Sequence, residues 1–419
     1  MKRVGVFLVV CPLLALAWLE SSLHSAGHLT TPPRIDCYFE NWAIYRPGVG
    51  IYRLDDIPVL FCTHMHYAFI GLNATTWGVL ILDEWFDVIQ DGLRGFNNLT
   101  RKNPGLKTSV AIGGWNEGGK KYSEMVAVKE RRTAFIQSLI DFCNKYGFGG
   151  VLLDWEYPGA ADRDGAPADK DNFLSLVVEL REAFDAVGKG WEIAIAVAVT
   201  KTRVQDGYHV KELCKHVDAV HAMTYDLRGS WDGKTYCHTP LFNTSCDSAA
   251  FQDLNVKAGM ELWLSNGCPA SKLSMGIGFY GRTFSVLADT TNPEPCTAVN
   301  TAVGAGEPGE YTREGGVLAY YEICARVQNK TSPWPKKEIQ GAKCSYAYQG
   351  NQWVGFDDKV DIEEKMKHIR EKGYAGASIW TIGMDDFRGL CGEKNLLLTT
   401  INEGLKGYRV PHPPHSTAA

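Results

Sequence analysis

Residues 148–158 read Phe-Gly-Gly-Val-Leu-Leu-Asp-Trp-Glu-Tyr-Pro, an apolar run that ends in two acids. Strand side chains alternate between two faces, so Leu152, Asp154 and Glu156 are expected on one face of a buried strand. A strand that ended in a solvated turn would also carry acids here. However, Tyr-Pro-Gly closes the segment sharply, as a loop at the catalytic rim of a parallel barrel does, and the neighbouring aromatic residues favour a sugar-binding face. The pattern therefore predicts two chemically active acids at the carboxyl end of a strand.

Short apolar runs of the same kind recur along the chain and alternate with amphipathic stretches. The candidate strands are residues 35–39, 64–70, 108–112, 150–155, 192–199, 219–224, 274–279 and 375–381. Between them, residues 128–146 and 171–186 carry apolar side chains at helical spacing. Eight strand–helix units with nearly continuous apolar strands predict an α/β fold, a closed (β/α)8 TIM barrel rather than an open sheet.

One connection is too long for a simple crossover. Residues 284–353, between the seventh and eighth candidate strands, are rich in Tyr, Gly and Pro, and predict a small α+β insertion beside the cleft. The barrel with this insertion is expected to span residues 27–407. The Pro- and His-rich residues 408–419 predict a flexible tail or the start of a linker.

The amino-terminal segment has the pattern of a secretory signal peptide. Lys2 and Arg3 precede an apolar run over residues 4–19, and small residues follow, so we expect residues 1–26 to be removed. A membrane anchor is the alternative interpretation. The run is slightly short for a span, and no second apolar run follows it. The mature protein is therefore expected to be extracellular and free of the membrane.

Other sequence features agree with secretion. Sequons for N-glycosylation occur at Asn73, Asn98, Asn243 and Asn329. Of twelve cysteines, Cys11 leaves with the signal peptide, and the remaining odd number leaves at least one unpaired. Their wide spacing favours disulfides over a zinc site, and neither a metal nor an organic cofactor is implied. A net charge of −5 argues against nucleic-acid binding, and a monomer is expected.

Eight motifs occur in a characteristic order. They are Cys-Tyr-Phe-Glu-Asn-Trp at 37–42, His-Tyr-Ala-Phe at 66–69, Ser-Val-Ala-Ile-Gly-Gly-Trp at 109–115, Asp-Trp-Glu-Tyr-Pro-Gly at 154–159, Met-Thr-Tyr-Asp at 223–226, Tyr-Gly-Arg-Thr-Phe at 280–284, Trp-Val-Gly-Phe-Asp-Asp at 353–358 and Gly-Ala-Ser-Ile-Trp at 376–380. On these motifs the chain resembles glycoside hydrolase family 18, and within it the secreted animal chitinases, especially those of arthropods. The resemblance covers roughly residues 35–405.

The resemblance implies a role for each residue of the catalytic motifs. Cleaving a glycosidic bond requires an acid for the leaving oxygen, and in this family the N-acetyl oxygen of the substrate serves as the nucleophile. Glu156 would be the general acid and later the base, with a pKa raised by burial. Asp154 would orient the acetamido group, Tyr225 would bind its carbonyl oxygen, and Asp226 would contact the sugar at the cleavage point.

Aromatic residues are expected to bind the sugar chain. Trp380 would form the floor under the sugar, because the C–H groups of a pyranose stack on an indole. The other candidate substrate-binding residues are Tyr38, Trp42, Trp115, Tyr157, Met223 and Arg282. Trp42 and Arg282 either contact sugar or support the fold. Trp115 and Trp231 either line the cleft or pack on the surface.

The chain departs from the family signature Asp-x-x-Asp-x-Asp-x-Glu at its first two aspartates, which are Gly149 and Leu152 here. In relatives the inner aspartate is thought to share a proton with the residue aligned to Asp154. Without it, Asp154 loses a like charge, which lowers its pKa, and gains an apolar neighbour, which raises it. The sequence leaves the net sign open.

Three function hypotheses follow. The first is an endo-acting chitinase that hydrolyses β-1,4-linked N-acetylglucosamine with retention, at a rate that the missing aspartates leave open. The second is a secreted chitin-binding lectin; such relatives usually lose the glutamate, so Glu156 favours hydrolysis. The third, a growth-factor-like or immune-modulating barrel, has no sequence feature of its own.

The resemblance also assigns some disulfides. It implies Cys37–Cys62 and Cys324–Cys391, and Cys237 with Cys246 is a candidate pair that could close a short loop carrying Asn243. The partners of the other cysteines stay open.

Overall fold

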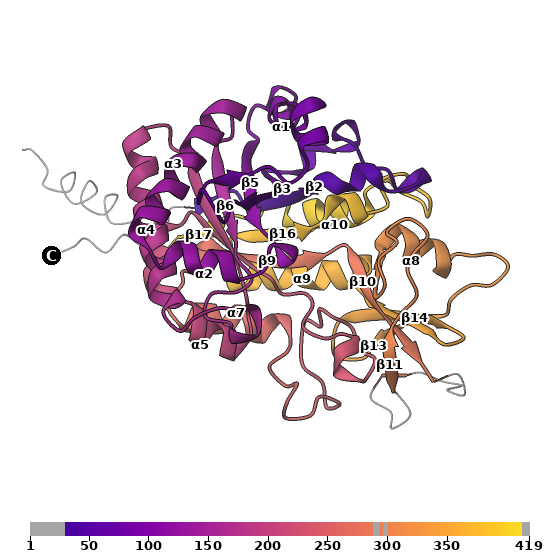
Figure 1. Cartoon of the computed structure of the whole chain (residues 1–419). Helices are drawn as coiled ribbons and strands as arrows, with labels where there is room; N and C mark the ends of the chain where they lie inside the picture. Colours follow the sequence, from indigo (N-terminus) through magenta and orange to yellow (C-terminus); the bar gives the residue numbers. More distant parts are fainter. Residues whose placement is uncertain (1–29, 288–293, 296–300, 413–419) are drawn as a thin grey trace, which may run out of the picture.

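The barrel is formed by parallel strands in the computed structural model, which describes residues 30–287, 294–295 and 301–412 (Figure 1). Its eight strands are β2 (Arg34–Glu40), β3 (His64–Leu72), β5 (Lys107–Gly113), β6 (Gly150–Asp154), β7 (Glu192–Val197), β8 (Ala219–Ala222), β9 (Leu273–Gly278) and β16 (Gly376–Trp380). They pair in the order β2-β16-β9-β8-β7-β6-β5-β3, and β3 pairs with β2 to close the ring. All eight strand predictions and the TIM-barrel fold are confirmed.

Helices cover the outside of the barrel (Figure 1). The longer ones are α3 (Lys129–Tyr146), α4 (Asp169–Val187), α7 (Val256–Ser265), α9 (Lys359–Lys372) and α10 (Leu396–Leu405), and shorter ones are α1 (Gly92–Asn97), α2 (Lys120–Val126), α5 (Lys201–Gly207) and α6 (Val210–His216). Helix α3 ends at Gly147, whose φ of 86° lets its N–H reach the carbonyl of Cys143. Both helix predictions agree with the structure to within two residues at each end. Within the described part of the chain, no helix combines the length and apolar character needed to cross a bilayer.

Strand β6 places its side chains on two faces as the sequence predicts. Val151, Leu153 and Trp155 pack outward against the helices, in the large core of the protein. Leu152 points into the barrel, where it is fully buried. Its companions there are Tyr38, Ala68, Ala111, Ala194, Ala196 and Ala219. These small side chains leave room for the larger ones, so the barrel interior is a packed core.

An antiparallel sheet forms the insertion and lies beside the barrel (Figure 1). It consists of β10 (Tyr280–Val286), β11 (Ala302–Ala305), β12 (Val317–Ala319), β13 (Lys336–Ile339), β14 (Cys344–Gln349) and β15 (Gln352–Phe356), with α8 (Tyr320–Val327) between β12 and β13. Phe284, Tyr346 and Trp353 form its own small core. The sheet starts at Tyr280 rather than 284, because the chain turns from β9 into β10 after a single residue.

The two ends of the described chain pair with each other. Strand β1 (Thr30–Thr31) is antiparallel to β17 (Val410–Pro411), and Val410 is buried. The prediction of a flexible tail from residue 408 is therefore wrong for this stretch, because Val410 packs into the core and its backbone joins a sheet. The expected signal peptide and residues 413–419 lie outside the described residues.

Disulfides join distant segments of the chain. Cys37–Cys62 and Cys324–Cys391 are confirmed, and Cys214–Cys268 is a further pair. The candidate pair Cys237–Cys246 is wrong, since Cys237 bonds to Cys344. Cys237 packs directly on the inserted sheet: a Cβ on Gly355 would lie 2.6 Å from its Cα. Cys246 is also disulfide-bonded, and Cys143 is the free, buried thiol found among the described residues.

Candidate active site

The predicted catalytic residues meet at the carboxyl-terminal mouth of the barrel. Asp154 ends β6, and Glu156 follows two residues later. Tyr225 and Asp226 follow β8, and Trp380 ends β16. The charges of Asp154, Glu156 and Asp226 all act on the Tyr225 hydroxyl, so these groups lie close together. The carboxyl ends of parallel barrel strands form one rim, which explains how residues distant in sequence converge.

Asp154 at the end of β6 and Glu156 two residues later are an unusual pair, because Asp154 is buried and Glu156 is partly buried. Burial raises the pKa of Asp154 well above its ordinary value, and the neighbouring Glu156 raises it further. Burial also raises the pKa of Glu156 to about 7, with an added contribution from the charge of Asp226. The sign that the sequence left open for Asp154 is thus settled by burial. Glu156 carries a proton below neutral pH and is able to donate it.

One carboxylate oxygen of Asp154 has no partner. Its Oδ1 is buried and accepts no hydrogen bond from any described residue. A bare buried anion is costly, so this environment favours the protonated acid. The backbone of Asp154 is fixed more firmly: its carbonyl accepts from the N–H of Gly114 at 2.8 Å. A Cβ on Gly113, where φ is +118°, would lie 2.0 Å from that carbonyl, so glycine is required there.

Asp226 is held from the inserted sheet. Both of its oxygens accept from Arg282, at 2.6 Å each, and Oδ1 also accepts from the Tyr280 hydroxyl at 2.8 Å. Burial would raise the pKa of Asp226, but the charge and hydrogen bonds of Arg282 keep it far below its ordinary value. Asp226 is therefore an anion throughout the useful pH range. Arg282 thus supports Asp226, and its contact with sugar stays a prediction.

His238 supports the same residue from behind, and the sequence gave no signal for it. Asp226 has a φ of 55°, which is unusual for a residue other than glycine. Its N–H donates to His238 Nδ1 at 3.2 Å, and the next N–H, that of Leu227, donates to the carbonyl of His238 at 2.9 Å. His238 Nε2 lies 3.0 Å from the carbonyl of Tyr280. Nδ1 is therefore the acceptor, and His238 holds the strained backbone in place.

An aromatic floor lies next to the acids and consists of Trp380, Phe69 and Trp42. Trp380 stacks on Phe69 with ring centroids 5.5 Å apart, and Phe69 stacks on Trp42 at 6.1 Å. Trp42 is 41% exposed, which suits a surface for sugar. Tyr38 is instead buried beneath Trp380 and hydrogen-bonds to His221 at 2.8 Å, so it supports the floor. Phe69 was missed in the sequence, although it ends the His-Tyr-Ala-Phe motif.

Further aromatic side chains stand exposed around this floor. Trp115 is 56% and Trp231 60% exposed, and the guanidinium of Arg282 lies 5.5 Å from the ring of Trp231. Tyr45, in the same short helix as Trp42, pairs with Trp85 at 6.1 Å, and both are about half exposed. The sequence analysis did not single out this last pair. Of the other predicted binding residues, Tyr157 is half-buried under Arg203, and Met223 packs on the inner core around Leu152.

The sequence profile described as glycosyl hydrolases family 18 matches residues 34–385, which include all eight barrel strands and the inserted sheet. The chain belongs to this family. The family is one of glycosyl hydrolases. The acids at the mouth of this barrel are of the kind that cleavage of a glycosidic bond requires.

Relatives in this family are chitinases and a chitinase-like protein. An endochitinase of Manduca sexta is 51% identical over 395 residues, which cover 94% of this chain and 71% of that protein. The group IV chitinase of Ostrinia furnacalis matches with a TM-score of 0.85 at 39% identity, over 89% of this chain and 100% of that one. Another structure of it is a complex with allosamidin. Human YKL-39, described as a pseudo-chitinase with retained chitooligosaccharide binding properties, has a TM-score of 0.81 at 30% identity, over 90% of this chain and 100% of that one.

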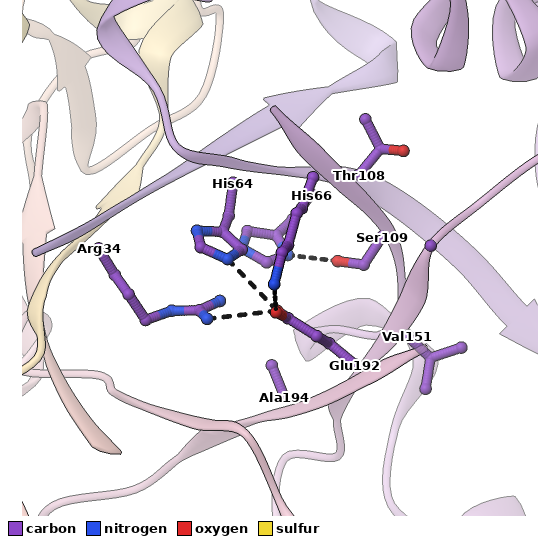
Figure 2. A pocket seen from close by; sticks show the side chains of 10 residues that line it. Arg34, His64, His66, Thr108, Ser109, Val151, Glu192 and Ala194 are labelled. Atoms are coloured by element: carbon purple, nitrogen blue, oxygen red, sulfur yellow. Dashed lines mark hydrogen bonds and ion pairs between the residues drawn. The ribbon is translucent and has the colours of Figure 1, made fainter. Parts of the chain in front are cut away.

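A polar cluster fills the opposite, amino-terminal mouth of this family 18 barrel. Figure 2 shows Arg34 and His64 converging on Glu192 inside a pocket there. Glu192 accepts from Arg34 at 3.2 Å and also from Lys107, and His64 Nε2 lies 3.3 Å away. Gly149 lines the same pocket, and a Cβ there would meet only the carbonyl of Thr108, at 3.4 Å. The pocket lies at the starts of the barrel strands, whereas Asp154 and Glu156 lie at and beyond the end of β6, so the pocket is separate from the two acids.

One group of buried residues in this region resembles a metal site in composition. Ligand atoms of Asp36, His66 and His221 lie within 4.8 Å of one another. However, Arg34 donates to both oxygens of Asp36, at 2.9 and 3.3 Å, and already neutralises its charge. We therefore interpret the group as an ion-pair network. In a second such group, Cys324 and Cys391 form a disulfide and offer no thiolate.

Proposed function

We propose that this protein is a secreted chitinase that cleaves β-1,4-linked N-acetylglucosamine chains internally and retains the anomeric configuration. The observation that carries the proposal is Glu156, a partly buried acid whose pKa is raised to about 7, next to the buried Asp154. A general acid works best when its pKa lies near the working pH. The Manduca relative is named an endochitinase, and a mutant of catalytic domain 2 of the Ostrinia furnacalis group II chitinase was solved in complex with (NAG)5.

The residues suggest how the reaction would run. Protonated Glu156 donates its proton to the glycosidic oxygen, which leaves with the released sugar chain. At the same time, the acetamido oxygen of the sugar at the cleavage point attacks the anomeric carbon of that sugar. Asp154 accepts a hydrogen bond from the acetamido N–H, and the Tyr225 hydroxyl donates to the acetamido oxygen. The Glu156 carboxylate then takes a proton from the water that opens the cyclic intermediate. Two inversions at one carbon give net retention.

The exposed aromatic residues favour a polymer over a short substrate. Trp42, Trp115 and Trp231 are exposed around the floor, and the Tyr45–Trp85 pair extends this surface. Each exposed ring is a platform for the apolar face of a pyranose. A surface longer than one sugar unit supports binding within a chain, as an endo-acting enzyme requires.

A lectin is the second candidate, and one observation favours it. Leu152 is fully buried below Asp154, so no carboxylate shares the proton of Asp154 from that position. YKL-39 shows that this fold can bind chitooligosaccharides as a pseudo-chitinase. Glu156 is retained here, and we therefore favour hydrolysis.

The deciding experiment is hydrolysis of chitin hexamer by the purified wild type, with the anomers of the first products separated within minutes. Early excess of the β-anomer supports a retaining endochitinase. Tight binding without cleavage would replace the enzyme with the lectin, and an early α-anomer would exclude the substrate-assisted mechanism.

The proposal includes secretion and glycosylation. Asn98, Asn243 and Asn329 are exposed and Asn73 is half-buried, so a glycan has access to each. Secreted protein should begin near residue 27 and lose mass on enzymatic deglycosylation. Retention of residues 1–26 at the mature amino terminus would contradict the signal-peptide prediction.

A further inference from the structure

Trp115 stands on a glycine-rich loop that is held by the N–H of Gly114, which donates to the carbonyl of Asp154, and by Glu117, which accepts from the N–H of Leu72 at 2.9 Å. Trp115 begins a short helical turn, η8 (Trp115–Glu117), directly after β5. Gly113, Gly114 and Gly118 surround it, with φ values of +118°, +87° and +71°. Glycines give up much conformational freedom on folding, and the contacts of Gly114 and Glu117 do not include the exposed indole itself.

Arg163 supplies contacts to this loop from the neighbouring one. It ends the turn η9 (Ala161–Arg163), which follows Asp154 and Glu156 in the chain. Its guanidinium carbon lies 3.7 Å from the centre of the Trp115 ring, and Nη2 donates to the carbonyl of Trp115. One face of the indole is therefore covered by a cation, and the planar group restrains both the ring and its backbone.

The same side chain contacts the catalytic acid. Arg163 Nε donates to the backbone carbonyl of Glu156 at 3.1 Å. A single guanidinium thus joins the peptide group of the acid to an exposed aromatic platform. Sugar that stacks on Trp115 would be positioned relative to Glu156 through this one residue.

Arg163 is itself anchored in the fold. The preceding residue, Asp162, accepts from both terminal nitrogens of Arg203 in α5, at 2.6 and 2.7 Å. The two loops also touch through their backbones, because a Cβ on Gly119 would lie 2.1 Å from the carbonyl of Arg163. Arg163 is therefore held in place and does not need the substrate to order it.

The charge of Arg163 also acts on Glu156. It lowers the pKa of Glu156, against burial and the charge of Asp226, which raise it. The titratable groups that act on or face this acid are Asp154 and Tyr157 from the same segment, Tyr38 from β2, Tyr208 after α5, and Tyr225 and Asp226 after β8. Among these and Arg163, only Arg163 is a cation, so its removal has a predictable sign.

We propose that Arg163 is a positioning residue that couples sugar binding on Trp115 to proton donation by Glu156. The inference rests on the proposed function, since it assigns a role within that reaction. Arg163 sets both where the platform lies and how readily the acid gives up its proton. Nothing about Arg163 requires it to touch the bond that is cleaved.

The test compares Arg163→Gln and Arg163→Met with Arg163→Lys, by hydrolysis of chitin hexamer across pH at equal folded fraction. In the two neutral variants, KM should rise about threefold to tenfold, because the Trp115 platform loses its cation. The alkaline limb of the pH–activity profile should move to higher pH by about half a unit or more, because Glu156 then keeps its proton to a higher pH. Lysine keeps the charge without the planar stack, so it should restore the position of the limb and leave KM raised.

Arg131→Gln is the matched control. Arg131 also stacks on an indole, that of Trp77 at 4.2 Å, and donates to the carbonyl of Glu124, but it lies outside the site. Its KM and pH profile should equal those of the wild type. An alkaline limb that stays in place in Arg163→Gln and Arg163→Met overturns the proposal, whatever happens to KM, and so does a lysine variant shifted as far as the neutral ones. If the wild type itself does not cleave the hexamer, the proposed function has failed instead.

Discussion

The guanidinium of Arg282 donates one hydrogen bond to each carboxylate oxygen of Asp226, both at 2.6 Å. Asp226 belongs to the barrel rim, whereas Arg282 lies in β10 of the inserted sheet. The insertion is therefore more than a wall beside the cleft, because it fixes the charge of a residue in the site.

Replacing Arg282 by Gln should lower kcat/KM by about tenfold to a hundredfold, since Asp226 loses its partner and its orientation. The pKa of Asp226 should rise from its depressed value, so the acid limb of the profile moves to higher pH. Steady-state kinetics across pH would measure both changes. Arg326→Gln is the control, because this arginine lies in the same insertion but contacts Trp334 and not the site. An unchanged acid limb in Arg282→Gln would show that the pair has no role in the charge of Asp226.

Glu156→Gln should reduce hydrolysis by about a hundredfold or more while oligosaccharide affinity changes little, because the amide keeps the shape but donates no acidic proton. In the wild type, activity should fall as pH rises through about 7, where Glu156 loses its proton. Turnover of chitin hexamer and calorimetric binding of the same oligomer would separate the two effects. Wild-type turnover in the variant would remove Glu156 from its assigned role.

Trp380→Ala should weaken oligosaccharide binding by roughly 1–3 kcal/mol, because it deletes the ring that stacks on Phe69 and that we propose as the floor under the sugar. Trp380→Phe retains an aromatic face and should lose less. Binding isotherms and thermal unfolding should be recorded together. A loss of stability without any loss of affinity would identify Trp380 as core rather than floor.

The sequence predicted the elements that depend on local pattern. Eight nearly continuous apolar runs predicted the barrel, and the acids at the end of one run predicted where the site lies. It did not predict the role of His238, because His238 is separated in sequence from Asp226 and accepts a hydrogen bond from the backbone N–H of Asp226 only in the folded chain. The pairing of Cys237 failed for the same reason, because its partner lies 107 residues away and was brought there by packing. The sign of the pKa change at Asp154 needed the degree of burial, which no motif encodes.

Leu152→Asp tests the missing inner aspartate. The structure makes this change costly, since Leu152 pairs in register with Ala111 and Ala194 and is fully buried among apolar side chains. We expect a loss of several kcal/mol in the free energy of unfolding, and in the folded fraction a pH optimum displaced from that of the wild type. Leu152→Asn separates size from charge, and Gly149→Asp can be added because a Cβ at this position would meet only the carbonyl of Thr108, at 3.4 Å, in the pocket at the amino-terminal mouth. Identical pH profiles in the folded double variant and the wild type would show that these two positions do not attenuate the enzyme.

His66 should make stability depend on pH. Burial lowers its pKa from 6.5 to about 4, although Asp36 opposes this shift. The unfolded chain takes up a proton below about pH 6.5 and the folded chain only near 4, so this contribution is present above 6.5 and is lost as pH falls to 4, by roughly 3 kcal/mol. Chemical denaturation of the wild type and His66→Gln from pH 4 to 7 would isolate the difference. His216→Gln serves as the control, and equal slopes for the wild type and His66→Gln would contradict the prediction.

The pairing of β1 with β17 places both ends of the described chain at the amino-terminal mouth of the barrel, since Thr31 lies just before β2 and Tyr408 bonds to Tyr374 just before β16. The acids lie at the other mouth. A solid support attached near Thr31 or near Val410 would thus bind the molecule at the amino-terminal mouth of the barrel, with the catalytic mouth facing the solvent. Immobilised protein should in that orientation remain accessible to a polymer as stiff and as large as a chitin fibril.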